Sequence, residues 1–289
     1  MRASLLTSLI AGNRKSLARA ISVIERGGPE ATSILRSING YIGGAYTIGI
    51  TGPPGAGKST LVDRMTSLIR SKPWRGIERS PTVSILAADP TSPFTGGAVL
   101  ADRVRMQQHY KDPGVFVRSM ATRGSLGGLP KTARNAVKLL DAYGSDVIIV
   151  ETVGVGQAEL DIMQLADIVV VVVVPEGGDA MQAMKAGLME IGDVFLVNKS
   201  DRPGAELMIR DISAVISWDT KKRHWTPVVL ATQASNGQGI EQLYETIQRH
   251  LVISTDTGLL TKRRLERRRI EFFETIKEHV DFEIQRLTL

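Results

Sequence analysis

The chain contains no cysteine among its 289 residues. Disulfide bonds and thiolate metal sites are therefore excluded, and the composition is compatible with a reducing cytosol. The four histidines are scattered along the chain, without the spacing of metal ligands. We expect each of them at the surface or at a helix cap; they are His109, His224, His250 and His279.

Long apolar runs are also missing. The most hydrophobic stretch, Val169 to Val174, is far too short to cross a bilayer and fits a central strand buried on both faces. Apolar residues near the amino terminus fall mostly at helical spacing and lack a signal-peptide cleavage pattern, so a docked amphipathic helix is expected there. These features favour a cytoplasmic protein that has no membrane partner.

Charge of one sign is only in small excess. The 36 basic and 30 acidic residues give a formal net charge of +6. Six basic residues between Lys262 and Arg269 can account for this excess, so a diffuse nucleic-acid surface is not indicated. We therefore expect no nucleic-acid partner; the alternative, binding through this basic run, predicts an affinity that falls steeply with salt.

The segment TIGITGPPGAGKST, residues 47–60, joins a β-branched run to a glycine-rich turn and then to an apolar helical pattern. Its G-x-x-x-x-G-K-S spacing is the P-loop signature, with a strand before it and a helix after it. Backbone N–H groups and a helix dipole then surround one anion, which suits a polyphosphate. Lys58 is expected to bridge the β- and γ-phosphates and Ser59 to ligate Mg2+. The predicted nucleotide site also includes Gly55, Ala56, Gly57 and Thr60.

Two acidic residues lie at the ends of predicted strands. A strand at 82–88 delivers Asp89, and a strand at 146–152 carries Glu151 near its end. Because ligands collect at the carboxyl ends of strands in open α/β sheets, both acids are expected near the phosphates. Glu151 occupies the place of the second magnesium-associated group, where aspartate is usual. Its contact with Mg2+ is either direct or through water.

The sequence NKSD, residues 198–201, follows another predicted strand at 193–197. This spacing lets the carboxylate of Asp201 accept hydrogen bonds from the N1–H and amino groups of guanine, which adenine does not offer. After a last core strand at 227–231, a loop follows whose backbone is expected to close over the base. The predicted ligands are GTP and GDP, with further contacts from Asn198, Lys199, Gln233 and Ala234.

Together these patterns predict an α/β fold, a P-loop NTPase with a mostly parallel central sheet flanked by helices. Residues 1–43 are expected to form an amino-terminal extension of two helices broken at Gly27-Gly28-Pro29. Residues 44–254 form the predicted GTPase domain, and residues 255–289 a helical arm. The arm has a substantial apolar face, which we expect to bury against a second copy in a homodimer rather than against its own core.

With the P-loop, Asp89-Pro90, ETVGVGQ at 151–157 and NKSD all in place, the chain closely resembles the MeaB/ArgK family of GTPases. Members of this family are chaperones of adenosylcobalamin-dependent acyl-CoA mutases. They are related to the human methylmalonic aciduria type A protein and, more distantly, to nickel-insertion GTPases. The likeness extends to GNRKSLARAI, residues 12–21.

The resemblance implies a set of metal-associated acids and a signalling loop. Asp89, Asp102 and Glu151 match family acids grouped around the metal and the attacking water. Residues 175–185 match a third switch loop, through which the family senses and signals to the mutase. The polar members of that loop are Asp179, Gln182 and Lys185.

The function implied by the resemblance is a GTP-hydrolysing chaperone. It would gate delivery, protection or reactivation of the cobalamin cofactor in methylmalonyl-CoA mutase or a close relative. No residue is an obvious water-positioning glutamine, so slow intrinsic turnover is expected, with Lys58 and Mg2+ stabilising charge.

Two other functions stay open at this point. A protein kinase linked to amino-acid transport needs a substrate hydroxyl in place of water and a base to receive its proton. A nickel-delivering metallochaperone is disfavoured because the chain has no cysteine and no histidine cluster.

Overall fold

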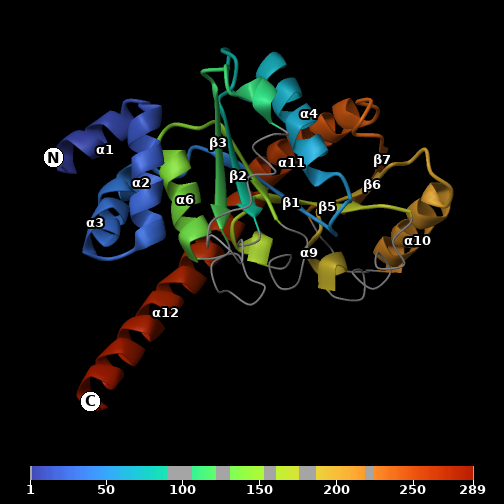
Figure 1. Ribbon diagram of the computed structural model, residues 1–289. Helices are drawn as coiled ribbons and strands as arrows, with labels where there is room; N and C mark the ends of the chain where they lie inside the picture. The colour runs from blue at the N-terminus through green and yellow to red at the C-terminus, as the bar shows by residue number, and fades with distance from the viewer. Residues whose placement is uncertain are drawn as a thin grey trace.

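The computed structural model describes residues 2–89, 106–121, 131–152, 161–175, 187–218 and 224–288 (Figure 1). These residues form a seven-stranded parallel sheet in the order β3-β2-β4-β1-β5-β6-β7. The predicted α/β fold with a central parallel sheet is confirmed. The strands are β1 (Tyr46–Thr51), β2 (Val83–Asp89), β3 (Val115–Ala121), β4 (Val147–Glu151), β5 (Ile168–Val173), β6 (Val194–Asn198) and β7 (Val228–Thr232).

The central strands are apolar along their whole length because both faces of the sheet are covered. Every residue of β1, β4, β5 and β6 is buried. Register places Ile50 opposite Glu151 and Thr51 opposite Val171. The carboxyl ends of β1 and β4 therefore meet at one edge of the sheet, where the glycine-rich loop begins.

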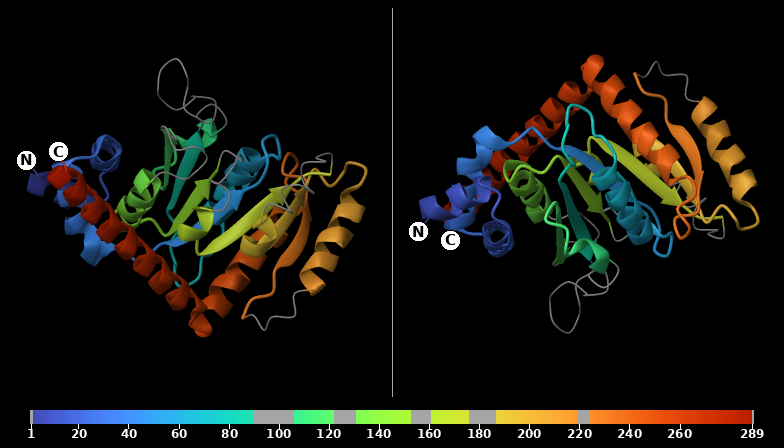
Figure 2. Two further views of the ribbon diagram at one scale, coloured as in Figure 1. Left: turned by 90° about the horizontal axis from the view of Figure 1, so that it is seen from below. Right: turned by 90° about the horizontal axis from the view of Figure 1, so that it is seen from above.

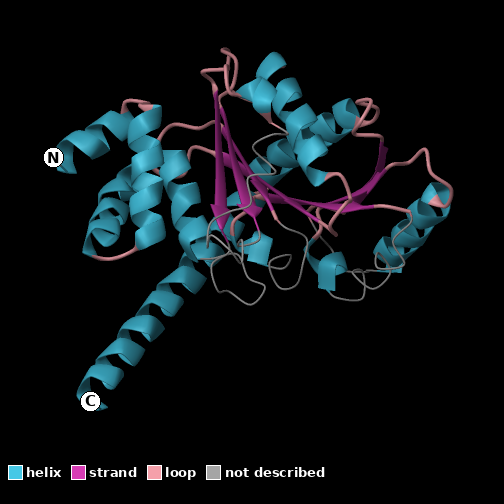
Figure 3. Ribbon diagram, in the orientation of Figure 1, coloured by secondary structure: helices cyan, strands magenta, loops and turns pink. Residues whose placement is uncertain are grey.

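Helices cover both faces of the sheet, as Figures 2 and 3 show. One face packs against α4 (Lys58–Ser71) and α11 (Ile240–Asp256). The other packs against α6 (Lys131–Ala142) and α10 (Ala205–Trp218). The shorter elements are η1 (Asn39–Tyr41), η2 (Gln107–His109), η3 (Ile162–Gln164) and α9 (Met189–Ile191).

Three helices, not the predicted two, form the amino-terminal extension: α1 (Arg2–Ile10), α2 (Arg14–Arg26) and α3 (Pro29–Ile38). The prediction missed the break before α2. There the side chain of Asn13 caps the new helix by accepting a hydrogen bond from the backbone N–H of Ser16 at 3.0 Å. α2 and α3 pack against α6 and extend the helical layer beyond the edge of the sheet (Figure 1).

β3 is longer than the short strand predicted at 115–117. It pairs with β2 along its full length, from Val83 opposite Val115 to Asp89 opposite Ala121. Its second half contains Arg118 and Ser119, which are tolerated because β3 is an edge strand. These polar residues interrupt the apolar run from which the strand was predicted.

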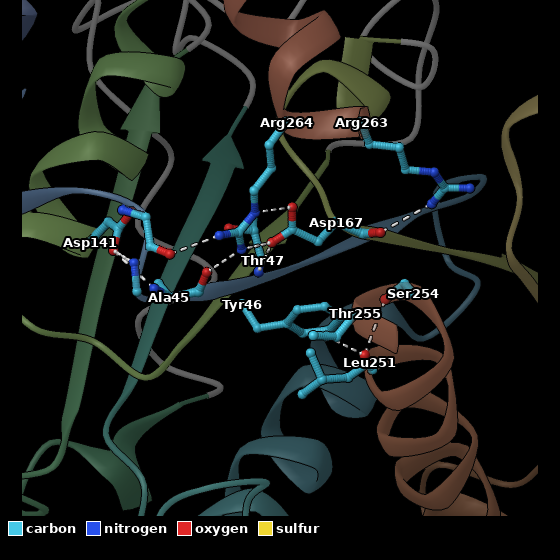
Figure 4. Close-up of polar contacts among 12 residues, drawn as sticks. Ala45, Tyr46, Thr47, Asp141, Asp167, Leu251, Ser254, Thr255, Arg263 and Arg264 are labelled. Carbon is cyan, nitrogen blue, oxygen red and sulfur yellow. Dashed lines mark hydrogen bonds and ion pairs between the residues drawn. The ribbon is translucent and has the colours of Figure 1, made fainter. Parts of the chain in front are cut away.

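The arm is a single 30-residue helix, α12 (Leu259–Thr288). Its first turns lie at the amino ends of β5 and β6. Buried aspartates just before β5 and β6 hold it there, and Figure 4 shows the first of them, Asp167, beside Arg264. Asp167 accepts hydrogen bonds from Arg264 at 2.6 Å and from Arg267. Asp193 accepts two from Arg263, at 2.8 and 3.1 Å. Three arginines of the basic run thus face the protein, which weakens the alternative of a nucleic-acid surface there.

Asp167 stays ionised in this setting. Burial alone would raise the pKa of its carboxyl, but the hydrogen bond and charge of Arg264 and the charge of Arg267 hold that pKa below its ordinary value. The backbone N–H of Thr47 also donates to it at 3.0 Å. The carboxylate is therefore a charged, fully satisfied link between α12 and β1.

The histidines were expected at the surface or at a helix cap, and two of the four are instead buried. His109 and His250 are buried, at 6% and 0% exposure, whereas His224 is exposed and the side chain of His279 lies outside the described part. The ring of His250 lies 2.6 Å from the hydroxyl of Tyr46, measured from Nδ1. Both buried histidines are held by polar partners within the protein, which explains their tolerance of burial.

The described ranges contain neither a metal-binding cluster nor a membrane-spanning helix. No cluster of three or more histidine, cysteine, aspartate or glutamate residues with metal-binding geometry occurs among them. Nor does any helix in these ranges combine the length and apolar character needed to span a membrane.

Candidate functional site

The glycine-rich loop between β1 and α4 is shaped by close backbone approaches. Gly52 has φ +136°, and a Cβ there would lie 2.0 Å from the carbonyl oxygen of Val172 on β5. Gly57 has φ +89°, and a Cβ there would lie 2.4 Å from Nδ2 of Asn198. Only glycine fits both positions, so the loop lies tightly against β5 and the end of β6.

Lys58 begins α4 and is held at the loop. Its ammonium donates hydrogen bonds to the carbonyl oxygens of Gly52 at 2.8 Å and Pro53 at 3.0 Å, and the residue is only 6% exposed. A positive charge and the amino-terminal end of a helix therefore coincide at the carboxyl edge of the sheet. This arrangement suits a bound polyphosphate.

Ser59 and Glu151, both predicted to associate with Mg2+, lie in direct contact. The hydroxyl of Ser59 donates a hydrogen bond to Oε1 of Glu151 at 2.7 Å, and both residues are buried. They come from the first turn of α4 and the end of β4. Hydroxyl and carboxylate oxygens are ligands that Mg2+ prefers, so this pair fits such an ion.

The ends of the strands around this pair are held together. Thr152, directly after Glu151, donates from its hydroxyl to that of Thr51 at 3.0 Å. Asp89 is the last residue of β2, and in the β2–β4 pairing Ala87 lies opposite Glu151. The backbone thus brings the ends of β1, β2 and β4 to one region.

Asn198 connects the predicted guanine-binding segment to the phosphate loop. Its Nδ2 donates to the carbonyl oxygen of Ala56 at 2.7 Å. Its Oδ1 accepts from the backbone N–H of Ala234 at 3.0 Å and from the hydroxyl of Thr232 at 3.1 Å. One buried amide therefore fixes the phosphate loop and the loop after β7 in a single arrangement.

The turn after Asn198 has an unusual backbone. Lys199 is the only residue other than glycine with positive φ in the described ranges, at 56°. Such a conformation costs about 1 kcal/mol or more for a residue with a side chain and tends to persist at functional sites. It is held by a hydrogen bond from the N–H of Ser200 to the carbonyl oxygen of Thr232 at 3.0 Å. Asp201 follows with an exposed side chain.

The other predicted site residues lie partly within and partly outside the described ranges. Gln233 pairs through its backbone with Gln238 beside Asn198, and Thr60 is exposed on α4. For Asp89 only the backbone is described. Asp102, Asp179, Gln182 and Lys185 lie outside the described residues, so their expected roles stay predictions.

Two connecting residues were not found from the sequence. Thr232 ends β7 opposite Asn198, and its place as a polar residue at a strand's carboxyl end is the signal that could have identified it. Arg64 of α4 donates to the carbonyl oxygen of Ser235 at 2.8 Å. These two residues are 171 positions apart, and no local pattern indicates their contact.

The chain matches a family model described as "Methylmalonyl Co-A mutase-associated GTPase MeaB" over residues 17–286. A putative GTPase of Pyrococcus horikoshii is 48% identical over 270 residues, covering 92% of this chain and 82% of that protein. GTPase ArgK of Escherichia coli is 34% identical over 284 residues, covering 94% and 82%.

A mouse protein, the mitochondrial methylmalonic aciduria type A homolog, is 30% identical over 294 residues, covering 96% of this chain and 69% of that one. Among solved structures, a crystal structure titled as an LAO/AO transport system kinase aligns with a TM-score of 0.78 and 27% identity. The alignment covers 96% of this chain and 84% of that one.

Proposed function

Because the chain belongs to the MeaB family of GTPases, we propose that it is a chaperone of an adenosylcobalamin-dependent acyl-CoA mutase. GTP binding and hydrolysis are the activity that it shares with its relatives. The family membership supports the chaperone role, and the nucleotide part of the proposal rests on the position of Asn198, whose side chain joins the phosphate loop to the loop after β7. A guanine base and a triphosphate can then be held by one rigid unit. The absence of cysteine supports a cytoplasmic location.

In this proposal the chain's own groups bind and orient the triphosphate. Lys58 places an ammonium, and α4 its amino-terminal N–H groups, where negative charge develops during transfer of the γ-phosphate. Ser59 and Glu151, with Asp89 and Asp102, hold a magnesium ion, which when bound neutralises phosphate charge. The hydrogen bond between Ser59 and Glu151 also holds the first turn of α4 against β4.

The guanine part of the proposal assigns base recognition to Asp201, Lys199 and the backbone of Gln233 and Ala234. Calorimetry with purified protein and magnesium tests it. We expect GTP and GDP to bind at least about 10^4-fold more tightly than ATP, because adenine leaves the acceptors of such a site unpaired. Equal affinities for GTP and ATP would contradict it. Asp201→Ala is expected to abolish the preference.

The mutase part is tested with methylmalonyl-CoA mutase from the same organism. We expect the mutase loaded with adenosylcobalamin to co-purify with the chain, and its rate of inactivation during turnover to depend on whether GTP or GDP is present. In this proposal residues 175–185 carry the signal, since loops that respond to the γ-phosphate are an established switching device. No association in either nucleotide state would contradict the chaperone role.

A second candidate function is a kinase. It is favoured by the similarity to the crystal structure titled as a transport system kinase. A kinase transfers the γ-phosphate to a side chain, whereas a GTPase transfers it to water. Incubation with γ-labelled GTP and a cell extract separates the two, because the label appears on protein in the first case and as inorganic phosphate in the second.

We also propose that α12 pairs with α12 of a second copy. By helical periodicity, one side of α12 carries Arg263, Arg264, Arg267, Glu271 and Glu274. This polar side faces the protein: the arginines contact the buried aspartates, Glu271 contacts Lys138, and Glu274 lies 2.6 Å from Arg134 of α6. The polar side of the helix is therefore already occupied.

The opposite side of α12 carries an apolar stripe that faces solvent. Figure 1 shows the helix leaving the body of the molecule toward the carboxyl end. An apolar stripe on a projecting helix, whose polar side is already paired, matches the same stripe on another copy. Its exposed fractions are Phe272 61%, Phe273 56%, Ile276 43%, Val280 48% and Ile284 57%.

A further inference from the structure

The segment that begins at Met106 lies along α4, the helix that starts at the phosphate loop. Met106 is fully buried and leads into η2 (Gln107–His109). Asp63 of α4 contacts η2, and Arg70 of α4 contacts Asp112. Because seven residues make about two turns, Asp63 and Arg70 lie on one side of the helix. The segment is therefore attached to α4 at two points.

The attachment at Asp63 uses its carboxylate and its backbone oxygen. Oδ2 accepts a hydrogen bond from Nε2 of Gln108 at 2.6 Å. Oδ1 lies 3.0 Å from Nε2 of His109, which also lies 3.2 Å from the backbone oxygen of Asp63. The side chains of Asp63 and His109 are only 16% and 7% exposed. This largely buried contact fixes η2 against the second turn of α4.

The attachment at Arg70 keeps the segment from sliding along the helix. Its guanidinium donates two hydrogen bonds, both 2.8 Å, to the carboxylate of Asp112. The N–H of Gly114 donates to the same carboxylate at 2.8 Å, and a Cβ at Gly114 would lie 2.3 Å from Arg70. Hydrogen bonding from Arg70 keeps the pKa of Asp112 below its ordinary value, although burial opposes this. The pair therefore stays charged.

The first attachment lies one helical turn from Ser59, which contacts Glu151. Residues 90–105, which include the expected metal ligand Asp102, join the described chain at Met106. We infer that Asp63 is a positioning residue for GTP hydrolysis, because its contacts with η2 fix the position of Met106, the residue after 90–105, relative to α4. Phosphoryl transfer depends on accurate positioning, so loosening this point slows the chemical step more than it weakens binding.

The test compares two isosteric changes on the purified full chain. Asp63→Asn removes the charge that faces His109. Glu241→Gln is the matched control, because Glu241 pairs with Lys72 just beyond the far end of α4 and has no contact with η2 in the described structure. We expect Asp63→Asn to lower kcat about tenfold. Its KM for GTP and its thermal midpoint should change little, and Glu241→Gln should leave kcat unchanged.

A double-mutant cycle tests whether the effect runs through η2. If it does, Asp63→Asn combined with His109→Gln lowers kcat no further than the larger single effect. Multiplied losses would overturn the inference, as would a kcat for Asp63→Asn within twofold of the wild type. A kcat loss that matches the fraction of unfolded protein would also overturn it.

A substitution of Gln108 tests the same contact with little effect on folding, because the side chain of Gln108 is exposed. Gln108→Ala removes the hydrogen bond that Oδ2 of Asp63 accepts from η2, and a reduced kcat with unchanged KM is expected. A folded Gln108→Ala protein with normal kcat would overturn the inference. These assays need no mutase, so their outcome is independent of the proposed chaperone role.

Discussion

At the scale of single residues, Gly57 lies directly against the side chain of Asn198. A methyl group at this position combines a strained positive φ with a clash against the amide that holds three segments together. We expect Gly57→Ala to lower the free energy of unfolding by about 3 kcal/mol. It should also weaken GTP binding, since the clash displaces Asn198. Urea denaturation and calorimetry measure the two effects.

The matched control for this change is Gly76→Ala. Gly76 also has a positive φ, +72°, but a Cβ there meets nothing within 4 Å. Its substitution should cost only the backbone strain, about 1 kcal/mol. Equal losses for the two variants would show that contact with Asn198 is not what requires glycine at position 57.

His250 gives the molecule a defined response to acid. Burial lowers the pKa of its ring to about 4 from the ordinary 6.5, although Asp193 and Asp167 oppose this; Arg263 adds to the lowering. The ring is therefore neutral at pH 7, and its 3.8 Å approach to Asp193 is not an ion pair there. The pKa of neighbouring Tyr46 is raised by burial, so its hydroxyl stays protonated.

Between pH 6.5 and 4 the unfolded chain binds a proton at position 250 that the folded chain does not. Stability should therefore fall with falling pH, by about 2 kcal/mol between pH 7 and pH 5 from this group. The pKa of Asp167 is lowered from 3.8 by folding. The stability that this carboxylate contributes is therefore lost only as the pH falls below 3.8. Urea denaturation at several pH values measures this dependence. His250→Gln should reduce the fall in the free energy of unfolding between pH 7 and pH 5, whereas His224→Gln at an exposed position should leave that fall unchanged.

At the scale of elements, α12 depends on a buried carboxylate. Asp167 is 2% exposed at its side chain and faces Arg264 and Arg267, so its loss leaves two guanidinium groups without their main partner. We expect Asp167→Asn to lower the free energy of unfolding by about 3 to 5 kcal/mol. Chemical denaturation at pH 7 is the measurement.

Asp256→Asn is the comparison for this change. Asp256 pairs with Arg75 at 3.0 Å, but its side chain is 60% exposed. Solvent screens such a pair, so less than about 1 kcal/mol should be lost. A similar small loss at Asp167 would mean that α12 is held chiefly by other contacts.

The elements also show what the sequence allows one to predict. β1, β4, β5 and β6 are recognisable because burial on both faces produces unbroken apolar runs. β3 was predicted too short because it lies at the edge of the sheet, where Arg118 is tolerated. The helix break at Asn13 was missed because apolar spacing continues across it, although the cap itself was readable.

At the scale of the whole molecule, contacts within a short segment can be predicted from the sequence, whereas contacts between distant segments cannot. The phosphate loop and NKSD are local patterns with a fixed chemistry, so their residues could be named in advance. The contact of Asp167 with Arg264 joins residues 97 positions apart, and that of Asp63 with His109 joins separate elements. Such contacts are formed by charged and polar residues that occur throughout the sequence, and the residues next to them in the sequence do not indicate which partner they contact.

The same scale includes the proposed dimer, which sequence and structure support by different routes. The sequence supplies an apolar face on the arm. The structure adds that the polar side of α12 is already occupied and that the apolar stripe remains exposed. Pairing of two such stripes removes from water side chains worth about 1.5 to 3 kcal/mol each when fully buried.

A charge within this stripe should therefore separate the copies. Phe273→Glu is expected to halve the mass measured by light scattering after size-exclusion chromatography, since pairing would bury a carboxylate without a partner. Thr275→Glu is the control, because Thr275 is exposed on the same helix but outside the stripe. Basal GTP hydrolysis should persist in both variants, as neither residue is near the phosphate loop along the chain. A monomeric wild-type protein, or a dimer that survives Phe273→Glu, would mean that the stripe has another occupant.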